Sequence, residues 1–134
     1  MAVKINYSIG YNIDAVGFKN RVKSGRAGQN QLWGSIVMPS TAIGYSSDAK
    51  IKIFEASKEL SKDKTNYVAK FGQAMTAFCY MYGYGVEQDE KKGFKIAEKA
   101  IDHDGYGFCY YVLGEAYFYG VGTKKDVQKG EKFL

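Results

Sequence analysis

The chain has 134 residues, of which 46% are hydrophobic and 25% are charged, and its formal net charge is +5. This composition is typical of a folded globular domain and excludes a disordered chain, while the mild positive charge allows an acidic partner without requiring nucleic acid. No apolar run reaches the roughly eighteen residues that cross a membrane, and the N-terminal residues lack the pattern of a cleavable signal peptide. We therefore expect a cytoplasmic protein without a membrane partner, and secretion that uses no cleavable signal stays open.

The N-terminal part, residues 1–47, predicts a small module that contains β-strands. Apolar residues occupy every odd position from 5 to 13, which is typical of a half-buried strand: Ile5, Tyr7, Ile9, Tyr11 and Ile13. A short helix is expected over residues 14–24, with Ala15, Phe18 and Val22 on one face, and the run QLWGSIVM at 31–38 predicts a second strand. Because two strands alone are only marginally stable, we expect this module to dock on the rest of the chain.

The next segment, residues 48–66, predicts a helix and a connection. Asp48 stands where an N-cap residue is wanted, and the apolar residues of one face recur at helical spacing: Ile53, Ala56 and Leu60. We interpret this helix as the second half of a degenerate helical hairpin, because two further copies of such a hairpin follow it.

An internal repeat occupies the C-terminal half. The octets YGYGVEQD at 82–89 and YGVGTKKD at 119–126 lie 37 residues apart. When residues 72–97 are set against 109–134 without a gap, eight positions are identical, whereas unrelated segments would share about one or two. The identical pairs are Tyr80/Tyr117, Tyr82/Tyr119, Gly83/Gly120, Gly85/Gly122, Asp89/Asp126, Lys92/Lys129, Gly93/Gly130 and Lys95/Lys132.

Each copy predicts a helix, a glycine turn and a second helix. Apolar spacing predicts first helices over 67–82 and 106–119, and a second helix over 90–102. The turns share two glycines and an aspartate: Gly83, Gly85 and Asp89 in one copy, Gly120, Gly122 and Asp126 in the other. The first glycine can take the positive φ that ends a helix, the second permits a tight turn, and the aspartate is expected to cap the second helix. A phosphate-binding loop is excluded, because these glycines end a helix and no Gly-Lys-Ser/Thr follows.

Both copies resemble the SEL-one-like repeat, a relative of the tetratricopeptide repeat, over about half the chain. The matching residues are Tyr80, Gly83, Gly85, Val86, Asp89, Lys92, Lys99 and Ala100 in the first copy, and Leu113, Gly114, Tyr117, Gly120, Gly122, Asp126 and Lys129 in the second. Gly93 and Gly130 replace the alanine of the pattern. Glycine weakens a helix by about 1 kcal/mol relative to alanine, so we expect another backbone to approach closely at these positions.

The expected fold is mainly α: a short α-solenoid of helix-turn-helix repeats with an N-terminal β-containing extension, and so α+β overall. A single hairpin cannot bury its apolar face, so neighbouring hairpins must stack on it. The expected units are the extension at 1–47, a degenerate half repeat at 48–66, a repeat at 67–103 and a partial repeat at 104–134.

The resemblance also implies where a partner binds, because first helices of tetratricopeptide-like solenoids line the concave face. Several side chains of the expected first helices fall outside their predicted core stripe: Phe78, Met81, Tyr111, Glu115 and Phe118. We expect these residues to contact a protein partner. The alternative, which the sequence leaves open, is that the N-terminal module or a further repeat covers the aromatic ones.

A basic cluster lies in the N-terminal part: Lys19, Arg21, Lys23 and Arg26. These residues could contact an acidic protein surface or nucleic acid. A solvated helix end accounts for them as well, because cations are favourable near a helix C-terminus.

Signals for catalysis or metal binding are weak. His103 is the only histidine and has no nucleophile at a suggestive spacing, so we expect a solvated loop residue and no enzyme activity. One histidine and two separated cysteines, Cys79 and Cys109, predict no metal site, and no cofactor is expected. Some proteins of the resembled family bridge neighbouring repeats by a disulfide, but Ile101 stands at the upstream site here, so both thiols are expected to be buried and reduced.

The sequence thus predicts a non-enzymatic protein-protein interaction module that presents a rigid helical surface. Two alternatives stay open: a small inhibitor or immunity-type protein that blocks an enzyme or complex, and a nucleic-acid-associated adaptor that uses the basic cluster. The residues name no particular partner.

Overall fold

The computed structural model describes residues 11–37, 44–101 and 107–133. These residues form seven helices: α1 (Ala15–Lys23), α2 (Arg26–Val37), α3 (Ser47–Leu60), α4 (Asn66–Tyr82), α5 (Glu90–Ala100), α6 (Gly107–Tyr119) and α7 (Val127–Phe133). Among the described residues there is no strand, and one isolated parallel bridge joins Tyr11 to Tyr45. The described part of the chain is therefore mainly helical, as the repeats predict.

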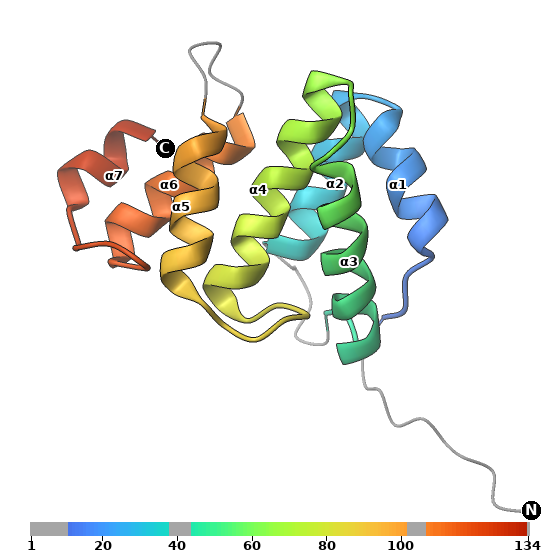
Figure 1. Cartoon of the computed structure of the whole chain (residues 1–134), viewed down its shortest axis with the longest axis horizontal. Coiled ribbons are helices and arrows are strands. Elements are labelled where there is room, and N and C mark those ends of the chain that lie inside the picture. Colours follow the sequence, from blue (N-terminus) through green and yellow to red (C-terminus); the bar gives the residue numbers. More distant parts are fainter. Residues whose placement is uncertain (1–10, 38–43, 102–106, 134) are drawn as a thin grey trace, which may run out of the picture.

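Helices α3 to α7 follow one another as a row of stacked hairpins (Figure 1). Helix α4 packs against α3, α5 and α6, and α6 packs against α5 and α7. Helix α1 contacts α3 and α4, just as α4 contacts α5 and α6. Helix α1 therefore stands in the place of a first helix, and α2 is inserted between it and α3.

The core lies along α4, where 11 of the 17 residues are buried. Phe71 and Met75 of this helix are fully buried, and they belong to the same cluster as Leu113 of α6. Apart from Ala15, which is half-buried, the inner faces predicted for α1 and α3 are buried in this cluster as well: Phe18, Val22, Ile53, Ala56 and Leu60. The solenoid therefore has one continuous core, which includes the N-terminal helices.

The glycine turns have the predicted backbone. The φ angles are positive at all four turn glycines: 65° at Gly83, and 72° at Gly85, Gly120 and Gly122. The carboxylates of Asp89 and Asp126 cap α5 and α7, each accepting a hydrogen bond at 3.1 Å from the backbone N–H three residues further on. The turn chemistry predicted from the repeat is confirmed.

The second glycine of each turn also touches the preceding second helix. A Cβ atom at Gly85 would overlap the backbone carbonyl of Lys50 in α3, and one at Gly122 would overlap the backbone carbonyl of Glu90 in α5. Two independent effects therefore exclude a side chain at these glycines: the positive φ angle and the overlap with the preceding helix. These contacts bring each hairpin directly against the helix before it.

The close approach expected at the helix glycines is also confirmed. A Cβ atom at Gly93 would lie 2.6 Å from the carbonyl oxygen of Ala77, and one at Gly130 would lie 2.8 Å from that of Gly114. Glycine thus lets the two helices of a hairpin approach closely, and the packing gained offsets its cost of about 1 kcal/mol in helix propensity.

The prediction of a second strand at 31–38 is wrong, because this run is helical up to Val37. The buried residues of α2 follow the i, i+3, i+4, i+7 spacing of a helix: Gln29, Leu32, Trp33 and Ile36. Gln29 is polar and lies before the run at 31–38. The three buried apolar residues that remain in the run are too few to distinguish the helical period from that of a strand.

The predicted first strand lies mostly outside the described residues, and its described end makes only the bridge from Tyr11 to Tyr45. The N–H of Ser46 donates to the carbonyl oxygen of Tyr11 at 2.9 Å. This bond places Ser46 as the N-cap of α3, where its Oγ accepts from the N–H of Ala49 at 3.1 Å. The prediction of Asp48 as the cap is therefore wrong, and Asp48 lies in the first helical turn.

Replacing Gly85 by alanine is expected to lower the free energy of unfolding by about 2–4 kcal/mol, because a strained φ combines with overlap against α3. Gly34 provides a matched control inside α2, where an added Cβ atom meets nothing within 4 Å beyond its chain neighbours and the adjacent backbone of its own helix. Alanine there should be neutral or stabilising by up to about 1 kcal/mol. Urea denaturation measures both values, and equal stability of the two variants would contradict the role given to the turn.

Candidate functional site

One side chain of α2 joins the first helices of both copies of the repeat. The Trp33 ring is 5% exposed, and its centroid lies 4.9 Å from that of Phe108 and 5.8 Å from that of Tyr111, both in α6. The rings of Phe71 and Phe78 in α4 each lie 6.2 Å from it. Helix α2, which passes behind α4 in Figure 1, therefore covers a face shared by α4 and α6. We call it the first-helix face.

Hydrogen bonds complete this contact. The Gln29 side chain is fully buried, and its Nε2 donates to the carbonyl oxygens of Val22 at 3.1 Å and Tyr67 at 3.0 Å. The Tyr67 hydroxyl in turn donates to the carbonyl oxygen of Lys23 at 2.7 Å. Because the buried amide has partners on both sides, α1 and α2 join the repeats without leaving this donor unsatisfied.

Truncating Trp33 to alanine is expected to lower the free energy of unfolding by about 3–5 kcal/mol, because the cavity would open between two hairpins. Val16 of α1 is 61% exposed, and its change to alanine should cost less than about 0.5 kcal/mol. Urea denaturation followed by circular dichroism compares the two variants. A loss below 1 kcal/mol for the tryptophan variant would show that α2 does not stabilise the repeats.

The prediction that Phe78 and Met81 contact a partner is corrected by their burial. Met81 is fully buried beside Gly93 of α5, and Phe78 is 8% exposed and lies against Trp33. A first helix has more than one buried face, because it packs on the second helix of its own hairpin and on the inserted α2 as well. The alternative that the N-terminal part covers the first-helix face therefore holds for Phe78.

A cluster of half-buried and exposed side chains joins the C-terminal end of α4 to α6, and we call it the tyrosine patch: Tyr82, Tyr111, Glu115, Phe118 and Tyr119. The Glu115 carboxylate accepts hydrogen bonds from the hydroxyls of Tyr82 at 3.0 Å and Tyr111 at 2.9 Å. Tyr82 is 40% exposed and Tyr119 is 64% exposed. The Phe118 ring packs edge-on against Tyr119 with the centroids 4.9 Å apart. The patch thus combines aromatic surface with one carboxylate.

The hydroxyls of Tyr82 and Tyr111 stay protonated at neutral pH. Partial burial, and then the negative charge of Glu115, raise the pKa of Tyr82 far above its ordinary value. Burial, followed by the hydrogen bond to Glu115, raises the pKa of Tyr111 to about 12. Both hydroxyls therefore act as neutral donors, and Glu115 is the carboxylate that they surround.

Sequence alone places Tyr82 and Tyr119 in the repeat motif and does not predict that they form a surface. Their signal is that they occupy the same position in both copies, directly before the turn glycine. A repeated tyrosine is equally consistent with a core position, so only the packing of the helix ends reveals their exposure.

The basic cluster is divided between two helices. Lys19 forms an ion pair with Glu59 of α3 at 2.8 Å, which lowers the pKa of that exposed carboxyl. Arg21 and Lys23 lie in the last turn of α1, where the helix dipole favours cations, and Arg26 begins α2. This placement fits the solvated helix end better than a dedicated binding site.

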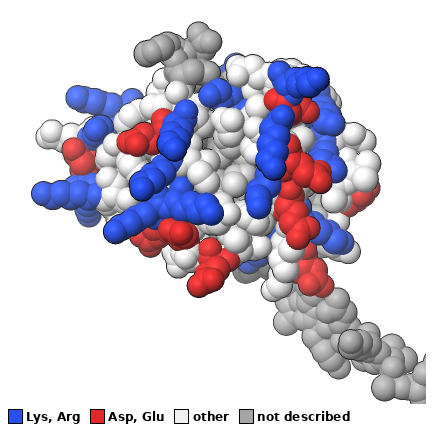
Figure 2. Space-filling view, in the orientation of Figure 1, with Lys and Arg blue, Asp and Glu red and all other residues white. Residues whose placement is uncertain are grey.

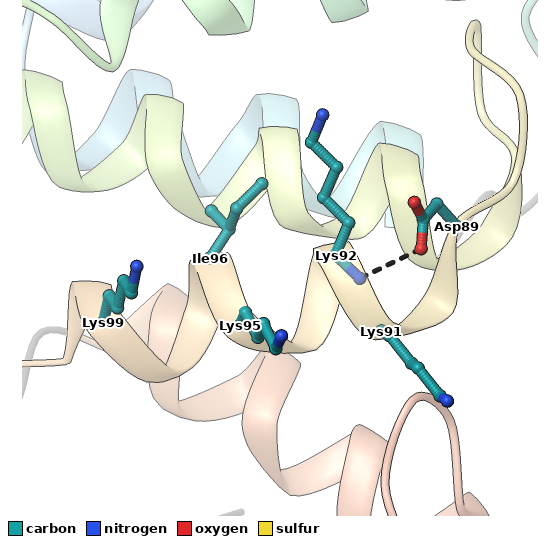
Figure 3. A pocket seen from close by; sticks show the side chains of 6 residues that line it. All are labelled: Asp89, Lys91, Lys92, Lys95, Ile96 and Lys99. Atoms are coloured by element: carbon teal, nitrogen blue, oxygen red, sulfur yellow. Dashed lines mark hydrogen bonds between the residues drawn. The ribbon is translucent and has the colours of Figure 1, made fainter.

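A second charged surface lies on α5, where Figure 2 shows blue side chains beside a mixed red and blue column over α3. Figure 3 shows the residues that line a groove of about 400 Å³ there: Asp89, Lys91, Lys92, Lys95, Ile96 and Lys99. The Lys92 ammonium lies 4.7 Å from the ring centroid of Tyr80, and Lys129 lies 4.6 Å from that of Tyr117. Because both copies keep this cation-π contact, the lysine of the motif joins the two helices of one hairpin.

The cysteines do not form a reactive site. Cys79 and Cys109 are free and buried, and burial raises the pKa of the Cys79 thiol. Among the described residues, no three histidine, cysteine or carboxylate side chains are grouped so as to hold a metal ion. His103 lies outside the described residues.

Labelling of the folded chain by a small thiol reagent should be at least about 1,000-fold slower than labelling in denaturant, because access to either buried thiol requires opening of the core. Reductant should leave the melting curve unchanged, since both cysteines are free. A drop in melting temperature on reduction would reveal a disulfide and contradict this description.

The helical hairpins match a known repeat family. The family model described as Sel1 repeat matches residues 71–105 and 107–134. Residues 71–134 therefore consist of two Sel1 repeats. The first match spans most of α4 and all of α5, and the second begins with α6 and continues through α7. The resemblance stated from the sequence is thus confirmed.

Sel1 repeats generally mediate protein-protein interactions and are a non-catalytic type of module. No curated protein matches this chain. In the described ranges, no helix is both long enough and apolar enough to cross a membrane. Protein binding is therefore the general function of this type of repeat, and the tyrosine patch is the candidate binding site.

Proposed function

We propose that this chain is a non-enzymatic protein-interaction module whose Sel1 repeats bind a partner through the tyrosine patch. The observation that supports the patch is the position of Trp33, which covers the first-helix face between α4 and α6 and leaves the helix ends beyond it exposed. The proposed interface therefore occupies only the part of α4 and α6 that Trp33 does not cover.

The chemistry of the patch suits a protein interface. Tyrosine and phenylalanine bury a large area, and they have few rotatable bonds to immobilise. The rings of Tyr111 and Phe118 are already partly buried by their neighbours. A few such aromatic anchors usually supply most of the binding energy of a protein interface.

The compartment proposed for this interaction is the cytoplasm. Support comes from the two cysteines, which carry free thiols inside the core, as is usual for chains that fold in a reducing environment. The lysine groove on α5 and the basic cluster on α1 and α2 are left outside the proposed interface.

Affinity capture from the source cell tests the patch. We expect a partner that the wild-type chain retains to be bound at least about tenfold more weakly when Tyr82 and Tyr119 are both changed to serine, since two aromatic anchors are lost. The matched control changes Val16 and Ile51, which are 61% and 44% exposed on α1 and α3, to serine.

The proposal predicts that the control variant captures the same partner as the wild type. Equal capture by the tyrosine variant would place the interface elsewhere. If the captured partner is an enzyme, its activity in the presence of the chain would also show whether binding inhibits it.

A further inference from the structure

We infer that the tyrosine patch binds a basic segment of its protein partner and seats one cationic side chain, arginine or lysine, against the Glu115 carboxylate. This inference rests on the proposed function and names the chemistry of the partner. It starts from the charge of Glu115 and from what docking would do to that charge.

In the described part of the chain, the hydrogen-bond partners of the Glu115 carboxylate are neutral hydroxyls. Its two oxygens accept hydrogen bonds from the Tyr82 and Tyr111 hydroxyls, and the pKa of each tyrosine is raised, so neither hydroxyl ionises at neutral pH. Among the described residues, no lysine or arginine nitrogen lies within 4.0 Å of this carboxylate. The carboxylate has further lone pairs that these two bonds do not use.

Docking would remove water from this uncompensated charge. A carboxylate that is buried without a counter-charge opposes binding, whereas a partner cation that donates hydrogen bonds to it offsets this effect. A partner that covers the patch with apolar or acidic groups is therefore disfavoured. A partner that brings an ammonium or a guanidinium group is selected.

The comparison of the two repeats shows that this charge is particular to the exposed copy. Residues 78 and 115 are equivalent, since they lie 37 positions apart. The first copy has Phe78, which Trp33 covers, and the second has Glu115 in the open patch. The position is thus apolar where Trp33 packs on it and carries a carboxylate in the half-buried patch.

The rings around Glu115 offer faces for a cation. This fold already holds its own lysines over tyrosine rings, with Lys50 over Tyr84 at 5.1 Å as well as the contacts of Tyr80 and Tyr117. In the described part of the chain, no lysine or arginine lies over Tyr82 or Tyr119. An ammonium or guanidinium group at Glu115 would gain cation-π contact with whichever of these exposed rings it reaches.

The test uses the full chain, labelled with ¹⁵N, and two synthetic peptides. One peptide has three arginines spaced by Gly-Ser pairs, and the other has citrulline, which is neutral and nearly isosteric, at the same positions. The net charge of +5 opposes non-specific binding of a cationic peptide, so saturable shifts confined to the residues of the tyrosine patch and their neighbours report binding there. We expect the arginine peptide to bind at least about tenfold more tightly than the citrulline peptide.

The variant Glu115→Gln keeps the shape and an acceptor for the tyrosines, and it should weaken binding of the arginine peptide by about tenfold. The control Glu98→Gln changes the net charge by the same amount, but Glu98 lies on α5 and outside the tyrosine patch. It should therefore change the affinity for the arginine peptide by less than about twofold. If the glutamine variant proves less stable, Tyr119→Leu serves in its place, since it removes an exposed ring face and leaves Glu115 intact.

Equal binding of both peptides, binding unchanged by Glu115→Gln, or shifts outside the patch would overturn the inference. The capture experiment with the serine variant separates this outcome from failure of the proposed function. Capture that depends on Tyr82 and Tyr119, together with no preference for arginine, would leave the protein interface standing and remove only its cationic specificity.

Discussion

The stacking of the hairpins depends on backbone contacts at the second glycine of each turn. Gly85 lies directly against the carbonyl of Lys50, and Gly122 against that of Glu90. A hydrogen atom is the only side chain that fits there, because any Cβ atom would overlap the preceding helix. These contacts set how closely one repeat follows another, and the alignment of α4 with α6 follows from that spacing.

The aligned first helices create a face that the chain itself partly fills. Trp33 requires Phe71 and Phe78 from one helix and Phe108 and Tyr111 from the next, so its site exists only when both hairpins are stacked. The inserted α2 thus joins two repeats that otherwise touch through neighbouring helices. Its presence also divides the face into a covered part and the exposed tyrosine patch.

Equivalent positions in the two repeats can take the same or different chemical roles. The tyrosine and the lysine of the motif form the same cation-π contact in both copies, through Lys92 in one and Lys129 in the other. Phe78 packs against Trp33 of α2, whereas Glu115 accepts hydrogen bonds from two tyrosine hydroxyls. The shared residues of the motif therefore build the scaffold, whereas the position of Phe78 and Glu115 differs in chemistry between the two copies.

The sequence by itself determined the repeat, its glycine turns and its aspartate caps, because these depend on interactions between residues close in the chain. It also determined the buried stripes of α1 and α3, where apolar spacing is regular. Only the tertiary structure decided that residues 31–37 are helical and that Phe78 and Met81 are buried, since a helix with several neighbours buries more than one stripe. The patch around Glu115 was decided there too, because a side chain is exposed only where no other segment packs, and that depends on contacts between residues far apart in the sequence.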